Sequence, residues 1–181
     1  MKIDSNANTV ILQLKQKLLS DASQEALIKT IAQSVYASNQ RRVHNTGKNV
    51  NESSIGSYSI KEIYVNPKNS PKKFQPIGKT GKTNFVGGKP HKTKYFREGY
   101  KGFRASIGRE TGHVNLQLTG KLFNSFQMKK DGSGYVIGFI GKNMAERARG
   151  LEKHFGGTLI WGVTNKDKQV INEIVKNWSK K

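Results

Sequence analysis

The sequence of 181 residues contains no cysteine. This absence excludes disulfide bonds and zinc sites built on thiolates, and it fits a reducing cytoplasm. The chain also has no run of roughly 18 apolar residues, the length that spans a bilayer as a helix. Residues 1–9 are polar and contain no apolar core of the kind found in signal peptides. We therefore expect a soluble protein that is made in the cytoplasm and has no membrane partner.

Acidic residues are scarce. The chain has 12 Asp and Glu against 32 Lys and Arg, which gives a formal net charge of +20 and a pI near 10.2. Such a charge repels itself unless a polyanion or an acidic surface lies nearby. Nucleic acid or an acidic protein surface is therefore the expected partner. The few acids are scattered over unrelated segments, so the sequence offers no obvious pair of catalytic carboxylates.

The length and the 34% hydrophobic content allow one domain with a real core. We predict a single structural domain over residues 1–181, with a mobile basic insert at about 66–112. The fold class is α+β: a small antiparallel sheet packed with about three to four helices, plus a long basic loop or arm.

Helical spacing of apolar residues predicts a short helix over residues 10–19 and a longer one from Asp21 to about residues 45–47. Alternation predicts a strand over residues 58–65. A second strand is expected over residues 114–119, where Gly120 then turns the chain.

The rest of the chain has clear local signals. A short helix or extended turn is expected over residues 122–126, followed by a hairpin that pairs residues 126–128 with 135–140. Asn143 is expected to cap a helix that stops at Phe155-Gly-Gly157, before a strand or extended return over residues 158–161. Thr164 and Asp167 have the capping-box spacing, and residues 170–178 form the terminal helix. Trp161 and Trp178 are expected in the core.

Between Lys68 and Arg109 the only acidic residue is Glu98. This arm has too little apolar content to order itself alone. The candidate docking or DNA-facing residues are Lys72, Lys73, Lys79, Lys82, Lys89, Lys92, Lys94, Arg97, Lys101 and Arg104. The arm also contains interleaved aromatic residues: Phe74, Phe85, Tyr95, Phe96, Tyr100 and Phe103. Three interpretations are open: folding against neighbouring subunits, contact with DNA phosphates, and plain solvation.

Residues 76–83 superficially suggest a phosphate-binding P-loop. A proline stands where that motif needs glycine, and neither the preceding strand nor the following helix is predicted. The four histidines have no short metal-binding spacing. No Ser, His and acid can be argued to meet. We expect no enzyme, no catalytic residue, no cofactor and no bound metal.

One ordered constellation remains, and its residues are suited to docking. It runs from a Thr-Gly turn through a serine and an isoleucine-glycine strand to a Phe-Gly-Gly turn, and its members are Leu118, Thr119, Gly120, Leu122, Ser125, Gly138, His154, Phe155, Gly156 and Gly157. This order resembles the tail-completion and virion-morphogenesis proteins of tailed phages, which join the head to the tail. The likeness covers roughly residues 114–158, with His154 in place of the family's usual glutamine.

The resemblance implies a structural virion protein of the head-to-tail connector: an α+β subunit that closes into a six- or twelve-fold ring around the DNA channel. Its partners would be the portal or an adaptor, tail proteins and, non-specifically, packaged DNA. Two alternatives remain open. One is a basic nucleic-acid-binding protein in which the arm, Arg41 and Arg42 grip phosphates; the other is a phage assembly chaperone that is absent from the mature particle.

Overall fold

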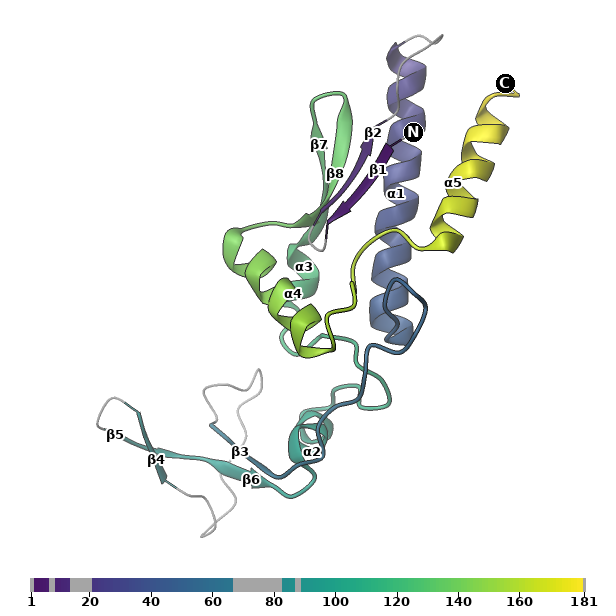
Figure 1. Cartoon of the computed structure of the whole chain (residues 1–181). Coiled ribbons are helices and arrows are strands. Elements are labelled where there is room, and N and C mark those ends of the chain that lie inside the picture. Colours follow the sequence, from purple (N-terminus) through teal and green to yellow (C-terminus); the bar gives the residue numbers. More distant parts are fainter. Residues whose placement is uncertain (1, 7–8, 14–20, 67–82, 87–88, 181) are drawn as a thin grey trace. The chain divides into compact units, whose positions relative to one another are not determined.

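A long helix and an antiparallel sheet form the larger of two parts of this chain. The computed structural model describes residues 2–6, 9–13, 21–66, 83–86 and 89–180, and the chain divides into two compact units. The first unit combines Met1–Ile55 with Asn115–Lys181, and the second is Gly56–Val114. The described residues form five helices and three antiparallel sheets (Figure 1), which confirms the predicted α+β class.

Helix α1 spans Asp21–Thr46 in the first unit. Its buried side chains recur at three- and four-residue intervals, as expected of a helix with one side against a core. They are Leu27, Ile28, Ile31, Ala32, Val35, Asn39, Arg42 and Val43. The helix is followed by Gly47, which has a φ of 60° and whose N–H donates to the carbonyl of Val43 at 3.2 Å. The predicted second helix and its end are confirmed.

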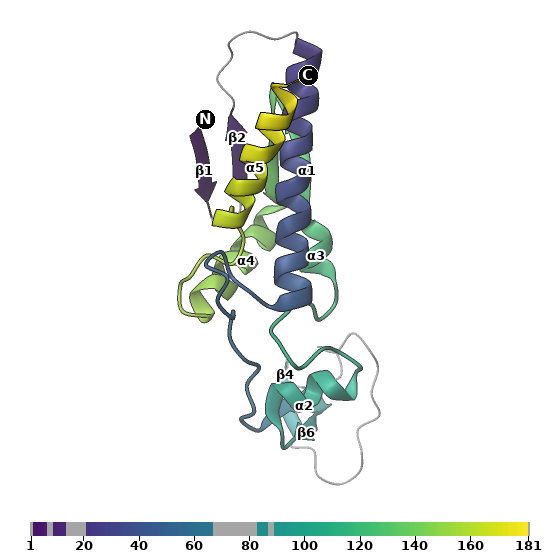
Figure 2. The same cartoon turned by 90° about the vertical axis from the view of Figure 1, so that its right-hand side faces the viewer.

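The sheet of the first unit has the strand order β1-β2-β8-β7, with each neighbouring pair antiparallel. Its strands are β1 (Lys2–Asn6), β2 (Thr9–Gln13), β7 (Phe126–Asp131) and β8 (Gly134–Phe139). β7 and β8 form the predicted hairpin, in which Gly132 turns the chain with a φ of 55°. Figures 1 and 2 show α1 running beside this sheet, and the rings of Tyr36 on α1 and Phe126 on β7 stack at 5.7 Å.

The prediction of a helix over residues 10–19 is wrong for residues 9–13, which form strand β2. Val10 pairs with Ile137 of β8, so β2 lies between two neighbouring strands. Val10 and Ile11 are β-branched, and such residues fit a pleated sheet well. Hydrogen bonding to two partners outweighs the helical spacing of the apolar residues. The remainder of the predicted helix, residues 14–19, lies outside the described residues.

The predicted strand over residues 114–119 is also wrong, because this segment has no regular structure. Leu116 has a φ of 55°, which a strand does not allow. The N–H of Gln117 donates to Oδ1 of Asn115 at 3.0 Å. A short polar side chain that bonds the nearby backbone in this way competes with a sheet ladder.

Two further helices follow the irregular segment. The short helix α3 (Lys121–Ser125) and helix α4 (Lys142–His154) were both predicted and are confirmed. Asn143 does not cap α4, however, since it lies in the first turn. The cap position is occupied by Gly141, whose φ of 87° favours glycine.

The terminal helix α5 spans Asn165–Trp178 and begins with the predicted capping box. Thr164 Oγ1 accepts from the N–H of Asp167 at 3.0 Å, and Asp167 Oδ2 accepts from the N–H of Thr164 at 2.8 Å. α5 lies alongside α1, as Figure 2 shows. Trp161 is buried as expected, but the segment 158–161 is irregular, and Trp178 at the end of α5 is half-buried.

The second unit contains a small core of its own. Strand β3 (Ile63–Val65) pairs with β6 (Lys94–Phe96), β4 (Thr83–Val86) pairs with β5 (Lys89–Lys92), and helix α2 spans Gly99–Ser106. Only residues 63–65 of the strand predicted over 58–65 are in a strand. Among the side chains of this unit that the structure describes, the buried apolar ones are Tyr58, Phe96, Phe103, Ile107 and Val114.

The segment expected to be a long basic loop at about 66–112 is partly ordered into these elements. The rings of Phe96 and Phe103 meet edge to face at 5.4 Å, which joins β6 to α2. Residues 67–82 and 87–88 lie outside the described residues. The interleaved aromatic residues therefore supply a local core that the lysine-rich composition did not indicate.

Candidate functional site

The predicted Thr-Gly turn and the serine that follows it connect α3 to the hairpin. Gly120 has a φ of 82° and stands at the start of α3, which contains Leu122 as a buried side chain. Ser125 Oγ donates to the carbonyl of Leu122 at 2.7 Å. The carbonyl of Ser125 accepts from the N–H of Ile140 at 2.7 Å, just after β8. The first half of the constellation is therefore one connected substructure.

Leu118 and Thr119 precede this turn in the irregular segment, and Gly138 lies buried near the end of β8. Gly138 pairs with Gln127 of β7 and with Thr9 of β2. The glycine thus occupies a central strand with a neighbour on each side. These residues therefore lie in the turn, the short helix and the central strand of the first unit.

The Phe-Gly-Gly turn ends α4. Phe155 donates its N–H to the carbonyl of Leu151 at 3.0 Å, and Gly157 donates to the carbonyl of Glu152 at 2.8 Å. Gly156 and Gly157 have φ values of 88° and 76°, which confirms the predicted reversal. The ring of His154 contacts that of Phe155 edge to face at 4.8 Å, and His154 is exposed.

Glu152 fixes the chain after that turn, and the sequence analysis missed it. Only 5% of this residue is exposed. Its Oε1 accepts from the N–H of Ile160 at 2.8 Å and from that of Trp161 at 3.4 Å. Burial raises the pKa of Glu152, while the two backbone donors oppose that rise. Its spacing of four residues from buried Ala148 was the available signal.

Arg42 and Asn39 hold the same return segment from the side of α1. The guanidinium of Arg42 donates from Nη1 to the carbonyls of Lys48 at 3.0 Å and Ile160 at 2.8 Å, and from Nη2 to Asn39 Oδ1 at 2.9 Å. Asn39 Oδ1 also accepts from the N–H of Gly162 at 2.9 Å. Desolvation lowers the pKa of Arg42. Arg42 is therefore a structural residue, not the phosphate-gripping one considered above, whereas Arg41 is exposed.

The ten candidate residues of the basic arm fall into different environments. Lys72, Lys73, Lys79 and Lys82 lie outside the described residues, and Lys89 and Lys92 are part of β5. Arg97 and Lys101 are exposed in the second unit. Lys94 is half-buried, with its ammonium 5.3 Å from the centre of the Phe96 ring. The described members therefore do not form one uniform solvated arm.

Arg104 has to be removed from the candidate docking or DNA-facing residues. Only 1% of it is exposed. Its guanidinium lies 4.1 Å from the centre of the Tyr58 ring, and its Nε donates to the carbonyl of Glu110 at 2.8 Å. A cation stacked on the face of an aromatic ring is attracted by the ring, and this contact stabilises the buried charge. The sequence showed only a basic residue among other basic residues.

Among the residues described, no group of three His, Asp or Glu side chains could hold a metal ion. Nor does any helix within the described ranges have the length and apolar character needed to cross a membrane. No protein-family model matches this chain, and no match was found among curated proteins or solved structures.

Proposed function

We propose that this chain is a structural virion protein of a tailed bacteriophage. It forms part of the head-to-tail connector, as a neck or tail-completion ring that joins the portal to the tail around the DNA channel, and it has no catalytic role. The observation that supports this proposal is that the residues carrying the resemblance form one connected substructure: α3, the β7–β8 hairpin, α4 and the Phe-Gly-Gly turn.

The chemistry of that substructure suits a rigid subunit. Gly120, Gly156 and Gly157 have left-handed backbone conformations, and Ser125 and Glu152 form hydrogen bonds with the backbone. Such residues fix the backbone conformation and do not supply reactive groups. Ring assembly from identical subunits needs surfaces held in fixed orientation, because each heterologous contact must repeat until the ring closes.

The charge supports the same proposal. A net charge of +20 needs a counter-charge, and a subunit around a DNA channel has one beside it. Acidic surfaces of portal or tail neighbours would serve as well. We accordingly propose a six- or twelve-fold homo-oligomer located at the head-to-tail interface of the virion.

The decisive experiment is the protein composition of purified particles. A nonsense mutation in the corresponding phage gene should give DNA-filled heads that lack tails, and supplying the wild-type chain in trans should restore tailed particles. Mass spectrometry should detect the chain in those particles. An assembly chaperone would restore tails but be absent from the particles, and this result would overturn the connector proposal.

A second candidate is a free nucleic-acid-binding protein, favoured by exposed basic residues such as Arg41, Arg97 and Lys101. Each phosphate that it neutralises should contribute about 0.9 to the slope of log K against log salt. Tight duplex binding by the monomer, with no chain in the particles, would favour this candidate over the connector.

A further inference from the structure

A groove of about 400 Å³ lies within the second unit. Three chain segments line it: residues 57–61, Lys101 on α2, and residues 111–113. The side chains that can bind a ligand are all able to donate hydrogen bonds, namely Ser57, Ser59, Lys61, Lys101, Thr111 and His113. No Asp or Glu is among the lining residues. The groove thus offers two ammonium groups and three hydroxyls to an electron-rich ligand.

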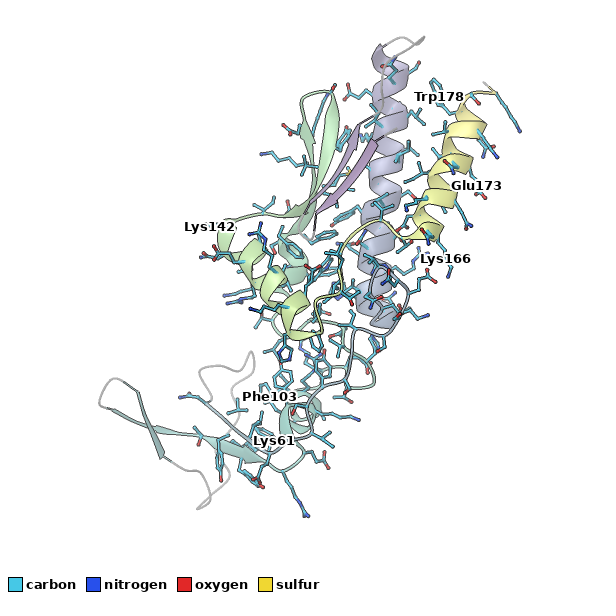
Figure 3. All side chains as sticks on the ribbon, viewed as in Figure 1. Lys61, Phe103, Lys142, Lys166, Glu173 and Trp178 are labelled. Atoms are coloured by element: carbon cyan, nitrogen blue, oxygen red, sulfur yellow. The ribbon has the colours of Figure 1, made fainter. Side chains whose placement is uncertain are left out.

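The backbone holds the two lysines in place. Gly99, the first residue of α2, has a φ of 64°, and a Cβ added to it would lie 2.3 Å from the carbonyl oxygen of Lys61. Only glycine allows so close an approach. The N–H of Lys101 donates to the carbonyl of Ser59 at 3.1 Å. The segment that carries Lys61 is therefore fixed against the first turn of α2, which carries Lys101; Figure 3 labels Lys61 near this helix.

Two carboxylates near the groove already have hydrogen-bond partners, and that of Glu110 is held by the backbone of the lining segment 111–113. Glu110 Oε1 accepts from the N–H of Gly112 at 2.5 Å, and this bond is the main cause that lowers the pKa of Glu110. His113 faces the same carboxylate and stabilises its charged form. Glu62 accepts from the hydroxyl of Tyr95 at 2.5 Å. Lys61 and Lys101 are both exposed.

We propose that this groove binds the phosphate groups of a nucleic-acid backbone. Ammonium and hydroxyl groups around a fixed concavity match the oxygens of a phosphodiester. A polyanion is favoured over a single free phosphate because residues 56–114 contain 13 Lys and Arg against 3 acids. Ile60 in the groove is 72% exposed and provides apolar surface beside the charges, where a sugar can pack.

This inference rests on the proposed function and deepens it, since DNA is the polyanion that a connector surrounds. The inference also changes which basic residues are proposed to contact DNA. Arg104 was a candidate but is buried, whereas Lys61 lies before the predicted arm and was not a candidate. The structure brings Lys61 to Lys101, although 40 positions separate them in the sequence.

The test compares the full-length chain with the double variant Lys61→Ala/Lys101→Ala in binding a fluorescently labelled 20-base-pair duplex across a range of salt concentrations. Loss of two phosphate contacts should lower the salt slope by about 1.8 and weaken binding roughly tenfold or more near 0.15 M salt. The matched control is Lys153→Ala/Lys176→Ala, which removes two exposed lysines from helices of the first unit. It should change the slope by less than half as much. Equal effects of the two double variants would overturn the proposal.

Inorganic phosphate provides the second arm of the test. In the wild-type protein it should shift the NMR signals of the Thr111 and Gly112 amides at millimolar concentrations, and the same amides should respond to the duplex at far lower concentrations. A response to phosphate, together with duplex binding that is unchanged in the double variant, would assign the groove to free phosphate and overturn the nucleic-acid proposal.

Failure of the groove and failure of the connector proposal give different results. If the double variant binds DNA like the wild type but the chain is present in tailed particles, only the groove proposal fails. If the chain is absent from particles while the double variant loses duplex affinity, the connector proposal fails and the groove remains a nucleic-acid site.

Discussion

Each of the two units buries one arginine, and the two arginines are held in different ways. Arg42 in the first unit donates to backbone carbonyls and to Asn39, and it connects α1 to the segment after the Phe-Gly-Gly turn. Arg104 in the second unit lies against the ring of Tyr58, and its Nε donates to the carbonyl of Glu110. Arg42 thus connects two irregular segments to α1, whereas Arg104 is part of the aromatic core of the second unit.

This comparison shows that the net charge of the chain overstates the number of basic side chains that a partner can contact. The sequence analysis considered both arginines as candidates for binding a partner. In the structure, both donate hydrogen bonds to acceptors within the chain. The cations that remain for a partner are those whose burial is low, such as Arg41 in the first unit and Lys101 in the second. We therefore test this difference by replacing one buried and one exposed arginine in each unit and comparing the effects on stability.

The largest effect should come from Arg42→Ala. The carbonyls of Lys48 and Ile160 and the amide oxygen of Asn39 would each lose a charged donor. Hydrogen bonds to charged groups contribute roughly 1.5–3 kcal/mol each, and the losses overlap, so we expect the free energy of unfolding to fall by about 3 kcal/mol. Urea unfolding followed by circular dichroism measures it.

Arg41→Ala is the matched control, because Arg41 is the exposed neighbour on the same helix. Its replacement should change stability by less than about 0.5 kcal/mol. Similar losses for the two variants would mean that the contacts of Arg42 contribute nothing beyond a general charge effect. The difference between the two is the quantity that matters.

What the sequence could predict was mainly local. The capping box of Thr164 and Asp167, the hairpin turn at Gly132 and the glycine reversal after α4 each depend on residues within a few positions. Local rules of this kind reach their conclusions without knowledge of the tertiary structure. The constellation of the candidate site was found for the same reason, since most of its members set turns.

The failures required distant partners. β2 was predicted as helix because its partner β8 lies more than 120 residues away in the sequence. Glu152, Asn39 and Arg42 were missed as members of the site because their acceptors and donors are on segments that only the fold brings near. The hint available was that these polar residues continue the buried stripes of α1 and α4.

A smaller effect is expected from Arg104→Ala in the second unit. A desolvated cation on an aromatic face contributes about 2 kcal/mol. We expect the second unit to lose about 2 kcal/mol in local stability, measured as faster amide hydrogen exchange in α2. Arg104→Lys should recover part of this, since it keeps the cation but loses the planar guanidinium.

Arg97→Ala is the control for Arg104→Ala, because Arg97 is exposed in the same unit. Exchange in α2 should be unaffected by it. If Arg104→Ala left exchange in α2 at the wild-type rate, Arg104 would be buried without stabilising the core, and the contrast between the two arginines would disappear.

The smallest effects test whether the reversal after α4 depends on its backbone conformation. Gly156 has a φ of 88°, while Gly150 is within helix α4, and a Cβ at either position would meet nothing within 4 Å. The space around the two positions is thus equal, and only the backbone conformation differs.

Gly156→Ala should destabilise the first unit by about 1 kcal/mol, because an L-residue is strained there. Gly150→Ala should instead stabilise it by up to about 1 kcal/mol, because alanine favours the helix. Thermal unfolding of both variants measures the two signs. Equal shifts would show that the Phe-Gly-Gly turn can reverse the chain without a left-handed glycine, and the geometric basis of the candidate site would then be wrong.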